Sequence, residues 1–301
     1  MSQNFPALFF GTDCFRYYTK DMENIRLETA KLALACDCHM HIWDPRFPLG
    51  PAHTPTRDAT VADYLRVRER LGLGRVVVVQ STAYGTDNEC TLDAIRQMGA
   101  SARGVAIVAP DVADGELARL TAAGIRGLRY VMFAGRLLTW DTMPVMAPRI
   151  ARFGWNINLQ LRGEELAERE ALLAGLACDV VIDHIGRFTA PFDNETAGVR
   201  ALYRLLDSGR CWVKLSAPYH GSKSGPPHYA DNGVLARELV RRWPERLLFA
   251  TNWPHPSVKG EPPDDLELMR LLWEWAPDAV TRRRILVDNP AALYFGGTSL
   301  R

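Results

Sequence analysis

The first residues in the chain whose types and spacing could do chemistry are two histidines, His39 and His41. They follow a short apolar run at 32–35 that predicts a strand, and residues two apart on a strand face the same side. Two imidazoles on one face, beside Asp37, could bind a metal, move protons or hold a carboxylate. The alternative interpretation is a pair of solvent-facing histidines in a loop after a buried strand.

Two cysteines precede this pair, but their positions do not predict a zinc site. Cys36 and Cys38 alternate with His39 and His41 along the chain, so we expect the two pairs on opposite faces. The six cysteines of the protein are scattered, which favours free thiols in a reducing cytoplasm over a disulfide framework.

The composition is that of an ordinary globular chain. Its 301 residues carry a formal net charge of +1, which leaves no electrostatic footprint for nucleic acid or an anionic membrane. No apolar run approaches the roughly 18 residues of a transmembrane helix, and the aromatic N-terminus lacks the features of a signal peptide. We expect a cytoplasmic protein with no nucleic-acid or membrane partner. The sequence leaves open whether the protein forms a homo-oligomer.

The elements that must position the histidines alternate between strands and helices. Strands are predicted at 32–35, 75–80, 103–108, 127–133, 156–161, 179–184, 211–215 and 246–250. Helices are predicted at 60–71, 88–98, 114–123, 141–153, 164–174, 196–208, 232–242 and 266–275, with a last short one starting at 288–290.

This alternation demands a parallel sheet with helical cover. Eight units in this length favour a closed (β/α)8 TIM barrel over a doubly wound open sheet, and no Gly-x-Gly-x-x-Gly follows the first strand. Residues 1–31 are predicted to be an N-terminal extension with a short helix at 21–31. Residues 32–301 are predicted to be one barrel domain.

In such a barrel the active site lies where the C-terminal ends of the strands open into loops. The residues at the predicted strand ends are almost all polar: His39, His41, Gln80, Ser81, Tyr84, Arg129, Gln160, Asp183, His184, Arg187, Lys214, Ser216, Tyr219, Asn252 and His255. Ends that served packing alone would show more Leu and Val. This convergence therefore predicts an enzyme.

At these positions the chain resembles the amidohydrolase superfamily, and within it the branch of 2-pyrone-4,6-dicarboxylate lactonase, the sugar lactonases and D-galactarolactone isomerase. The matching motifs recur in order along nearly the whole chain: DCHMH at 37–41, QS at 80–81, GTDN at 85–88, GLR at 127–129, DHIGR at 183–187, WVKLS at 212–216, TNWPH at 251–255 and DNP at 288–290. The resemblance implies a barrel of the metal-dependent-hydrolase type that acts on lactones, often ones carrying carboxylates.

The resemblance also bears on metal binding. The superfamily pattern uses a strand-four Lys or Glu, a strand-five His and a strand-eight Asp, where this chain has Arg129, Gln160 and Asn252. What remains is His39, His41 and His184, three imidazoles that could still hold a divalent metal such as zinc. Because the 2-pyrone-4,6-dicarboxylate lactonase branch is metal-independent, we expect no cofactor, with a zinc site on these three histidines as the alternative.

Asn252 separates the candidate reactions. A neutral amide cannot act as a general base, whereas an Asp there could activate water. Hydrolysis would need His184, oriented by Asp183, or one of the strand-one histidines as the base. Alternatively no water is activated, and the lactone moves between hydroxyls of one sugar acid, as the resemblance to D-galactarolactone isomerase implies.

We predict a metal-independent hydrolase that opens an anionic lactone of the 2-pyrone-4,6-dicarboxylate or sugar-acid type. A lactone isomerase is the second hypothesis, with a metal-dependent decarboxylase as a variant, and a non-catalytic barrel that binds lactone acids is the third. In the first, His39 and His41 donate hydrogen bonds to the lactone carbonyl and His184 moves the proton. The alternative for His184 is a satisfied core histidine.

The arginines are expected to bind the substrate's carboxylates. Arg129 and Arg187 suit bidentate recognition, although Arg187 could be a surface charge, and Lys214 could equally be a buried salt-bridge partner. The remaining residues predicted to line the site, or to anchor loops beside it, are Gln80, Ser81, Tyr84, Gln160, Tyr219 and His255.

Overall fold

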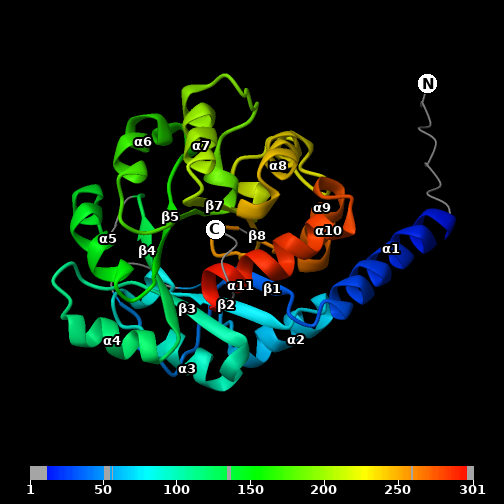
Figure 1. Cartoon of the computed structure of the whole chain (residues 1–301). Helices are drawn as coiled ribbons and strands as arrows, with labels where there is room; N and C mark the ends of the chain where they lie inside the picture. The colour runs from blue at the N-terminus through cyan, green and yellow to red at the C-terminus, as the bar shows by residue number, and fades with distance from the viewer. Residues whose placement is uncertain (1–11, 51–54, 56, 134–136, 259, 297–301) are drawn as a thin grey trace, which may run out of the picture.

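The computed structural model describes residues 12–296 except 51–54, 56, 134–136 and 259. Eight parallel strands, each paired with the next in sequence order, form a nearly closed barrel with helices between them (Figure 1). The strands are β1 (Cys36–Met40), β2 (Arg75–Val79), β3 (Ala102–Ala106), β4 (Ile125–Val131), β5 (Asn156–Gln160), β6 (Val180–Ile182), β7 (Cys211–Leu215) and β8 (Leu247–Phe249). The predicted (β/α)8 barrel is confirmed.

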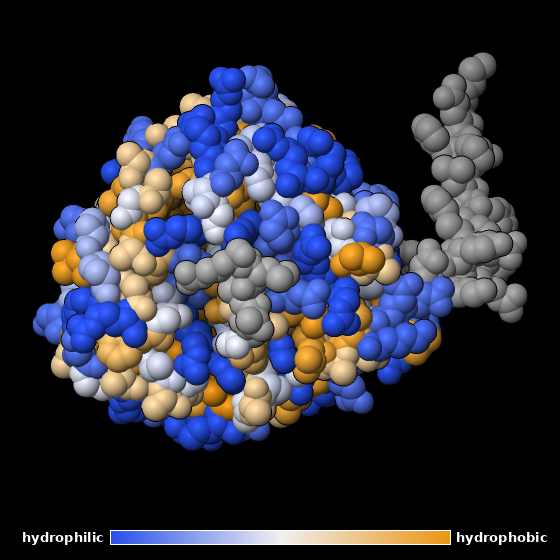
Figure 2. All heavy atoms as spheres, viewed as in Figure 1, coloured by the Kyte–Doolittle hydropathy of each residue, from blue (hydrophilic) through white to orange (hydrophobic). Residues whose placement is uncertain are grey.

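The helices surround this barrel. They are α1 (Thr12–Lys31), α2 (Val61–Leu71), α3 (Glu89–Met98), α4 (Asp114–Ala122), α5 (Met143–Ala151), α6 (Leu166–Ala174), α7 (Ala197–Asp207), α8 (Ala230–Arg242), α9 (Asp265–Trp275), α10 (Ala279–Arg283) and α11 (Asn289–Tyr294). Of the described part of the chain, no helix is both long enough and apolar enough to cross a membrane. Figure 2 shows hydrophilic side chains spread over the visible face, with hydrophobic ones scattered among them.

Helix α1 is longer than predicted. It begins at Thr12 rather than near residue 21, because no Gly or Pro interrupts the sequence between residues 12 and 31. Its C-terminal half packs on the barrel's outer helices: Met22 and Ile25 are buried, and Glu28 accepts hydrogen bonds from Trp273 and Arg282. Its N-terminal half projects away from the barrel (Figure 1). The first eleven residues of the predicted extension lie outside the described residues.

The first strand begins at Cys36, so the prediction of a strand at 32–35 is wrong. That run forms the turn that ends α1, with Ala35 N donating to Leu32 O. A register shift, of the kind that a β-bulge produces, lies between Asp37 and Met40. Because the bulge breaks the alternation of faces, Cys36 and Cys38 pack among apolar lumen residues while His39 also reaches into the lumen.

Two backbone hydrogen bonds join the first strand to the segment after the last. Asn252 N donates to His39 O and His41 N donates to Trp253 O, both at 2.8 Å. These bonds bring the end of β1 beside the loop that follows β8. They therefore fix the distance between the strand-one histidines and Asn252.

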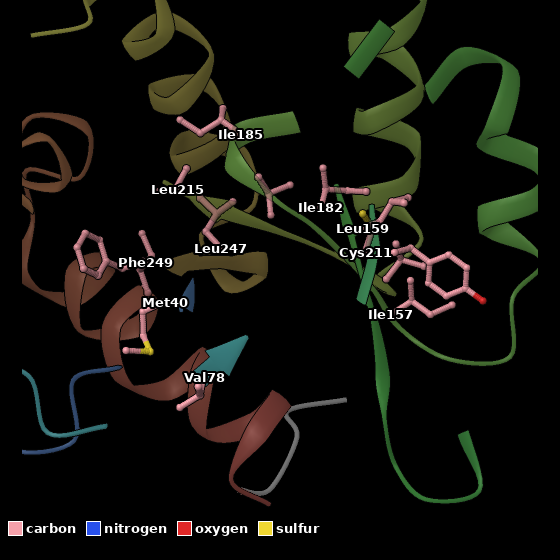
Figure 3. Close-up of a cluster of buried hydrophobic side chains, with 14 of the residues drawn as sticks. Met40, Val78, Ile157, Leu159, Ile182, Ile185, Cys211, Leu215, Leu247 and Phe249 are labelled. Carbon is pink, nitrogen blue, oxygen red and sulfur yellow. The ribbon is translucent and has the colours of Figure 1, made fainter. Parts of the chain in front are cut away.

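The barrel is filled by one apolar layer inside the strands and another between the strands and helices. The lumen layer contains Cys36, Cys38, Val77, Val79, Val105, Val181, Trp212, Leu248, Ala250 and Tyr294. The outer layer includes Met40, Val78, Leu159, Ile182 and Leu247, which lie on five different strands and are labelled in Figure 3. Burying each such side chain contributes about 1.5–3 kcal/mol to folding.

The C-terminal helix closes one end of the barrel. Tyr294 of α11 packs in the lumen and donates to Asn158 Oδ1 at 3.2 Å. Arg75 and Arg103, at or near the starts of β2 and β3, stack on Phe295. The strand starts are thus covered, and the opposite end is left for a site.

Candidate active site

A hollow of about 190 Å³ lies at the C-terminal ends of the strands. Its described wall consists of His41, Ser81, Thr82, Arg129, Val131, Gln160, His184, Arg187, His220, Asn252, Pro256 and Ser257. A larger hollow of about 740 Å³ lies at the opposite end of the barrel and holds none of the predicted site residues. No carboxylate belongs to the described wall of the smaller hollow, so its charge comes from arginine.

The two strand-one histidines bond to each other. His39 Nε2 lies 3.2 Å from His41 Nε2, and His41 Nδ1 lies 2.8 Å from Val79 O. Since a carbonyl oxygen only accepts, His41 carries its hydrogen on Nδ1, and its Nε2 accepts from His39. His39 is fully buried beneath the wall. This arrangement differs from the prediction that both rings donate to a substrate, because neither ring keeps a free N–H.

Beneath His39 lies a buried ion pair. Lys214 Nζ is 3.0 Å from Asp183 Oδ1 and 3.1 Å from His39 Nδ1, and it also donates to Asn158. Burial and the Lys214 and Arg129 charges lower the pKa of His39 to about 4, against the opposing effect of Asp183. Burial would raise the pKa of the Asp183 carboxyl, but Lys214 and His39 hold it well below its usual value. Lys214 is therefore a buried salt-bridge partner, which was one of the two roles expected for it.

His184 stands on the wall, and one of its ring nitrogens has no hydrogen bond to the described residues. It begins the 3₁₀ turn His184–Arg187, and its Nδ1 lies 2.9 Å from Ser216 Oγ. Burial and the neighbouring His39 lower its pKa well below the usual value, so the ring is neutral near pH 7. The predicted orienting partner Asp183 pairs with Lys214 instead, and the His184 ring is bonded to Ser216, the residue after β7.

Arginines from two strand ends reach the hollow. Arg129 donates to Gln80 O at 2.6 Å and to Gln160 Oε1 at 3.2 Å, while its buried Nε has no hydrogen-bond partner in the described part of the chain. Burial lowers the pKa of Arg129 to about 10, which leaves the guanidinium charged at neutral pH. Arg187 stacks over Phe133, with 4.5 Å from its guanidinium carbon to the ring centroid. Both predicted arginines therefore stand on the wall.

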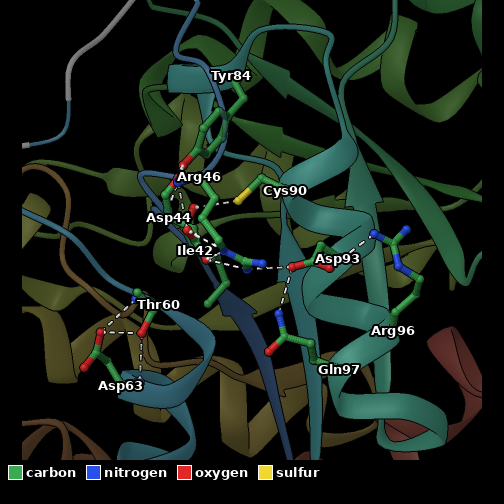
Figure 4. A network of polar contacts seen from close by, with 10 residues as sticks. All are labelled: Ile42, Asp44, Arg46, Thr60, Asp63, Tyr84, Cys90, Asp93, Arg96 and Gln97. Atoms are coloured by element: carbon green, nitrogen blue, oxygen red, sulfur yellow. Dashed lines mark hydrogen bonds and ion pairs between the residues drawn. The ribbon is translucent and has the colours of Figure 1, made fainter.

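Of the predicted residues after β2, one lines the hollow and two anchor nearby backbone. Ser81 is on the wall, and its hydroxyl accepts from Trp43 Nε1 at 2.9 Å. Gln80 holds the following loop by donating to Gly85 O and Asp87 O. The Tyr84 hydroxyl bonds the backbone of Asp44, beside the Arg46 ion pairs that Figure 4 shows, and lines a separate hollow.

Asn252 faces the hollow, and two other predicted residues lie behind it. Its Nδ2 donates to the Tyr219 hydroxyl at 2.8 Å, and that hydroxyl lies 3.0 Å from His255 Nδ1. His255 Nε2 lies 3.1 Å from Asp265 Oδ1 on α9. Tyr219 and His255 are therefore not on the described wall, although they reach it through Asn252.

Five residues of the described wall were not among those predicted: Thr82, Val131, His220, Pro256 and Ser257. His220 ends the 3₁₀ turn Pro218–His220, and its ring centroid lies 5.2 Å from that of His184. Its position directly after Tyr219 was the available signal. Burial and the Arg187 charge lower its pKa to about 3. Thr82 and Ser257 carry no signal beyond their nearness to strand ends.

Three buried groups lie close enough to be tested as metal ligands. The ligating atoms of His39, Asp183 and His184 all lie within 4.8 Å of one another, whereas His41 is not part of the group. The Lys214 ammonium occupies the same space, within 3.0 Å of the carboxylate and 3.1 Å of His39 Nδ1. This positive charge already neutralises the group's carboxylate and would repel a divalent cation. The residues present do not fit a metal.

The chain is similar to a known family and to several of its relatives. A family model described as amidohydrolase matches residues 36–296. The chain is 36% identical to a 2-pyrone-4,6-dicarboxylate hydrolase of Comamonas testosteroni, with 87% of this chain and 90% of the relative covered. It is 32% identical to a D-galactarolactone isomerase of Agrobacterium fabrum, covering 86% and 90%.

Two further similarities concern another lactone hydrolase and a solved structure. The chain is 32% identical to a 4-sulfomuconolactone hydrolase of Rhizobium radiobacter, over 86% of this chain and 89% of the relative. An apo crystal structure of an Agrobacterium tumefaciens protein superposes with a TM-score of 0.82 at 32% identity, covering 87% of this chain and 95% of that one. From the family match over residues 36–296, the chain belongs to the amidohydrolase family.

Proposed function

We propose that this protein opens an anionic lactone by hydrolysis, with His184 as the general base. The observation that carries the proposal is the His184 ring: it is neutral, bonded at Nδ1 to Ser216, and set on a wall that has two arginines and no described carboxylate. The names of the relatives, two kinds of lactone hydrolase and one lactone isomerase, support an enzyme that acts on lactones.

In this reaction the hydrogen on His184 Nδ1 is donated to Ser216, which leaves Nε2 free to accept a proton. Nε2 takes the proton from a water molecule as the water oxygen bonds to the lactone carbonyl carbon. The ring C–O bond then breaks, and the imidazolium returns the proton to the leaving oxygen. The product is an open-chain hydroxy acid, or its keto tautomer when the leaving oxygen is enolic.

The arginines supply the charge that the substrate needs. A carboxylate on the lactone binds the guanidinium of Arg187, which has no hydrogen bond to the described residues, and Arg129 on the same wall adds a second positive charge. Ser81 is the donor best placed for the lactone carbonyl. Its oxygen accepts from Trp43 Nε1 and Ala83 N, so its own hydrogen is free.

We also propose that the reaction needs no metal, since the Lys214 ammonium lies among the groups that would bind one. Metal analysis of the purified protein is expected to find far less than one equivalent, and turnover is expected to survive dialysis against a chelator. Loss of turnover on chelation that zinc restores would contradict this.

The direct test follows a panel of carboxylate-bearing lactones by NMR. A ring-opened acid is the expected product, and its formation is expected to disappear in His184→Gln. The matched control is His228→Gln, because His228 is an exposed histidine far from the hollow. Binding of a lactone without any turnover by the native chain would instead favour the non-catalytic barrel.

A lactone isomerase is the second candidate, and Asn252 favours it. An amide stands on the wall where a carboxylate would activate water, and its Nδ2 is bonded to Tyr219. In this case the NMR panel shows a rearranged lactone rather than an open acid. Asn252→Asp places a carboxylate there and is then expected to convert part of the product to the ring-opened acid. If the native chain isomerises and Asn252→Asp still gives no open acid, Asn252 is not what excludes hydrolysis.

A further inference from the structure

A line of hydrogen bonds runs from the first residue of helix α9 to the wall of the hollow. Asp265 Oδ1 lies 3.1 Å from His255 Nε2, and His255 Nδ1 lies 3.0 Å from the Tyr219 hydroxyl. The same hydroxyl lies 2.8 Å from Asn252 Nδ2. Of these four residues only Asn252 lines the hollow. The other three are therefore placed to act through it.

The carboxylate sets the direction of every bond in this line. A carboxylate oxygen accepts, so His255 bonds to it with a hydrogen on Nε2, and the tautomer with its single hydrogen there accepts at Nδ1. Tyr219 then donates to Nδ1. Burial raises the pKa of Tyr219, so the phenol keeps its hydrogen. Because that single hydrogen is used, the phenol oxygen accepts from the Asn252 NH2 group.

The far end of the line is an unpaired acceptor. Asn252 Oδ1 is buried and has no hydrogen-bond partner among the described residues. The backbone of Asn252 is held by its N–H on His39 O and by His255 N–H on its own carbonyl, both at 2.8 Å, at a φ of +62°. A buried acceptor without a partner is costly, so a bound molecule that donates a hydrogen bond there gains affinity.

We propose that Asp265, His255 and Tyr219 are positioning residues that keep the oxygen of the Asn252 amide, rather than its NH2 group, toward the bound molecule. The oxygen accepts a hydrogen bond from an O–H group, which is either a hydroxyl of the lactone or the attacking water. If His255 instead carried its hydrogen on Nδ1, Tyr219 would donate to the amide oxygen and the NH2 group would turn to the hollow. The identity of the O–H donor rests on the proposed lactone reaction. The direction of the hydrogen bonds from Asp265 to Asn252 does not.

The direction can be measured without any turnover. Nitrogen-15 NMR of the full chain labelled at histidine reports which ring nitrogen bears hydrogen, and His255→Gln identifies the His255 signals. The expected result at pH 7 is a neutral ring with hydrogen on Nε2. A ring with hydrogen on Nδ1, alone or on both nitrogens, would overturn the proposal. Absence of lactone turnover would defeat the proposed function yet leave this measurement intact.

The effect on the reaction is tested by a double-mutant cycle. Asp265→Ala and Tyr219→Phe are each expected to lower kcat about tenfold or more, by analogy with partners that orient site residues. The double variant is expected to lose no more kcat than Tyr219→Phe alone, because Asp265 acts through the Tyr219 hydroxyl. Glu267→Gln removes a charge from the same helical turn and is expected to leave kcat unchanged. Effects of Asp265→Ala that persist in the Tyr219→Phe background would show a structural role and contradict the proposal.

The source of the donor is read from a pair of lactones that differ in one hydroxyl. If the lactone hydroxyl donates to Asn252, Tyr219→Phe lowers kcat/KM for the hydroxylated lactone and spares the other. If water donates, Tyr219→Phe lowers kcat for both to the same extent. Equal activity of Tyr219→Phe and native chain toward both lactones would overturn the proposal.

Discussion

Lys214 changes what the two strand-one histidines can do. Its ammonium donates to His39 Nδ1, which leaves the His39 Nε2 hydrogen for His41, and His41 uses its own hydrogen on Val79 O. The three side chains form a continuous chain of hydrogen bonds that ends at His41 on the wall. Their chemistry is therefore to hold His41 and the adjacent backbone rigidly, and the donors for a substrate come from neighbouring strands.

Arg187 is the residue whose substitution best tests carboxylate binding. Arg187→Gln is expected to raise KM for a carboxylate-bearing lactone about ten- to a hundredfold, with a smaller change in kcat, because a buried charge-assisted pair is lost. Steady-state kinetics on the lactone acid and on its methyl ester measure the effect. The ester has no charge to lose and is expected to respond little. An equal response of acid and ester would assign Arg187 to the structure alone.

At the scale of elements, the loop after β7 is held against the loop after β6. Ala190 N donates to Gly221 O at 3.0 Å, and a Cβ at Gly221 would lie 1.9 Å from Phe188 O. The two loops carry His184 and His220, whose ring centroids lie 5.2 Å apart. Close packing of loop backbones thus places two wall residues that lie on different strand ends.

Gly221→Ala is expected to lower the free energy of unfolding by about 1–3 kcal/mol, because the added carbon forces these two backbones apart. Urea denaturation followed by circular dichroism measures the change. Gly115→Ala is the matched control, since a Cβ there meets nothing within 4 Å and Ala favours the helix. A Gly221→Ala protein as stable as the native chain would contradict the close approach.

Sequence patterns predicted seven of the eight strands within a few residues, because runs such as Val76–Val79 combine β-branched residues with burial on both sides. The first strand was misplaced because its apolar run 32–35 belongs to the turn that ends α1. The bulge in β1 has no local signal. It is a consequence of pairing with β2, and it brings the cysteines and His39 into one lumen.

For the whole molecule, buried neutral histidines make stability depend on pH. Burial lowers the folded pKa of His39 to about 4 and that of His220 to about 3, against about 6.5 in the unfolded chain. The part of the free energy of unfolding that depends on these neutral rings is fully present above pH 6.5. It is lost as pH falls toward 4, because the unfolded state binds the extra protons. Asp37, whose folded pKa burial raises to about 6, opposes this between pH 4 and 6 but binds only one proton.

The free energy of unfolding is therefore expected to fall as pH drops from 7 to 5, by about 1.4 kcal/mol per pH unit for each net proton. Urea titrations at a series of pH values measure the slope. His41 and His184, whose folded pKa values also lie well below the usual one, steepen the fall. A stability that stayed constant or rose over this range would contradict neutral burial of these rings.

The sequence by itself determined the barrel, the end of it that holds the site and most of the wall, because strand periodicity and the polarity of strand ends are local properties. It also predicts that Asn252 separates hydrolysis from isomerisation. Only the tertiary structure decided the roles. The Lys214 ammonium beside His39, the Ser216 bond to His184 and the line from Asp265 to Asn252 each join side chains from different strands or helices. No spacing along the chain encodes such contacts, since they depend on how the elements pack.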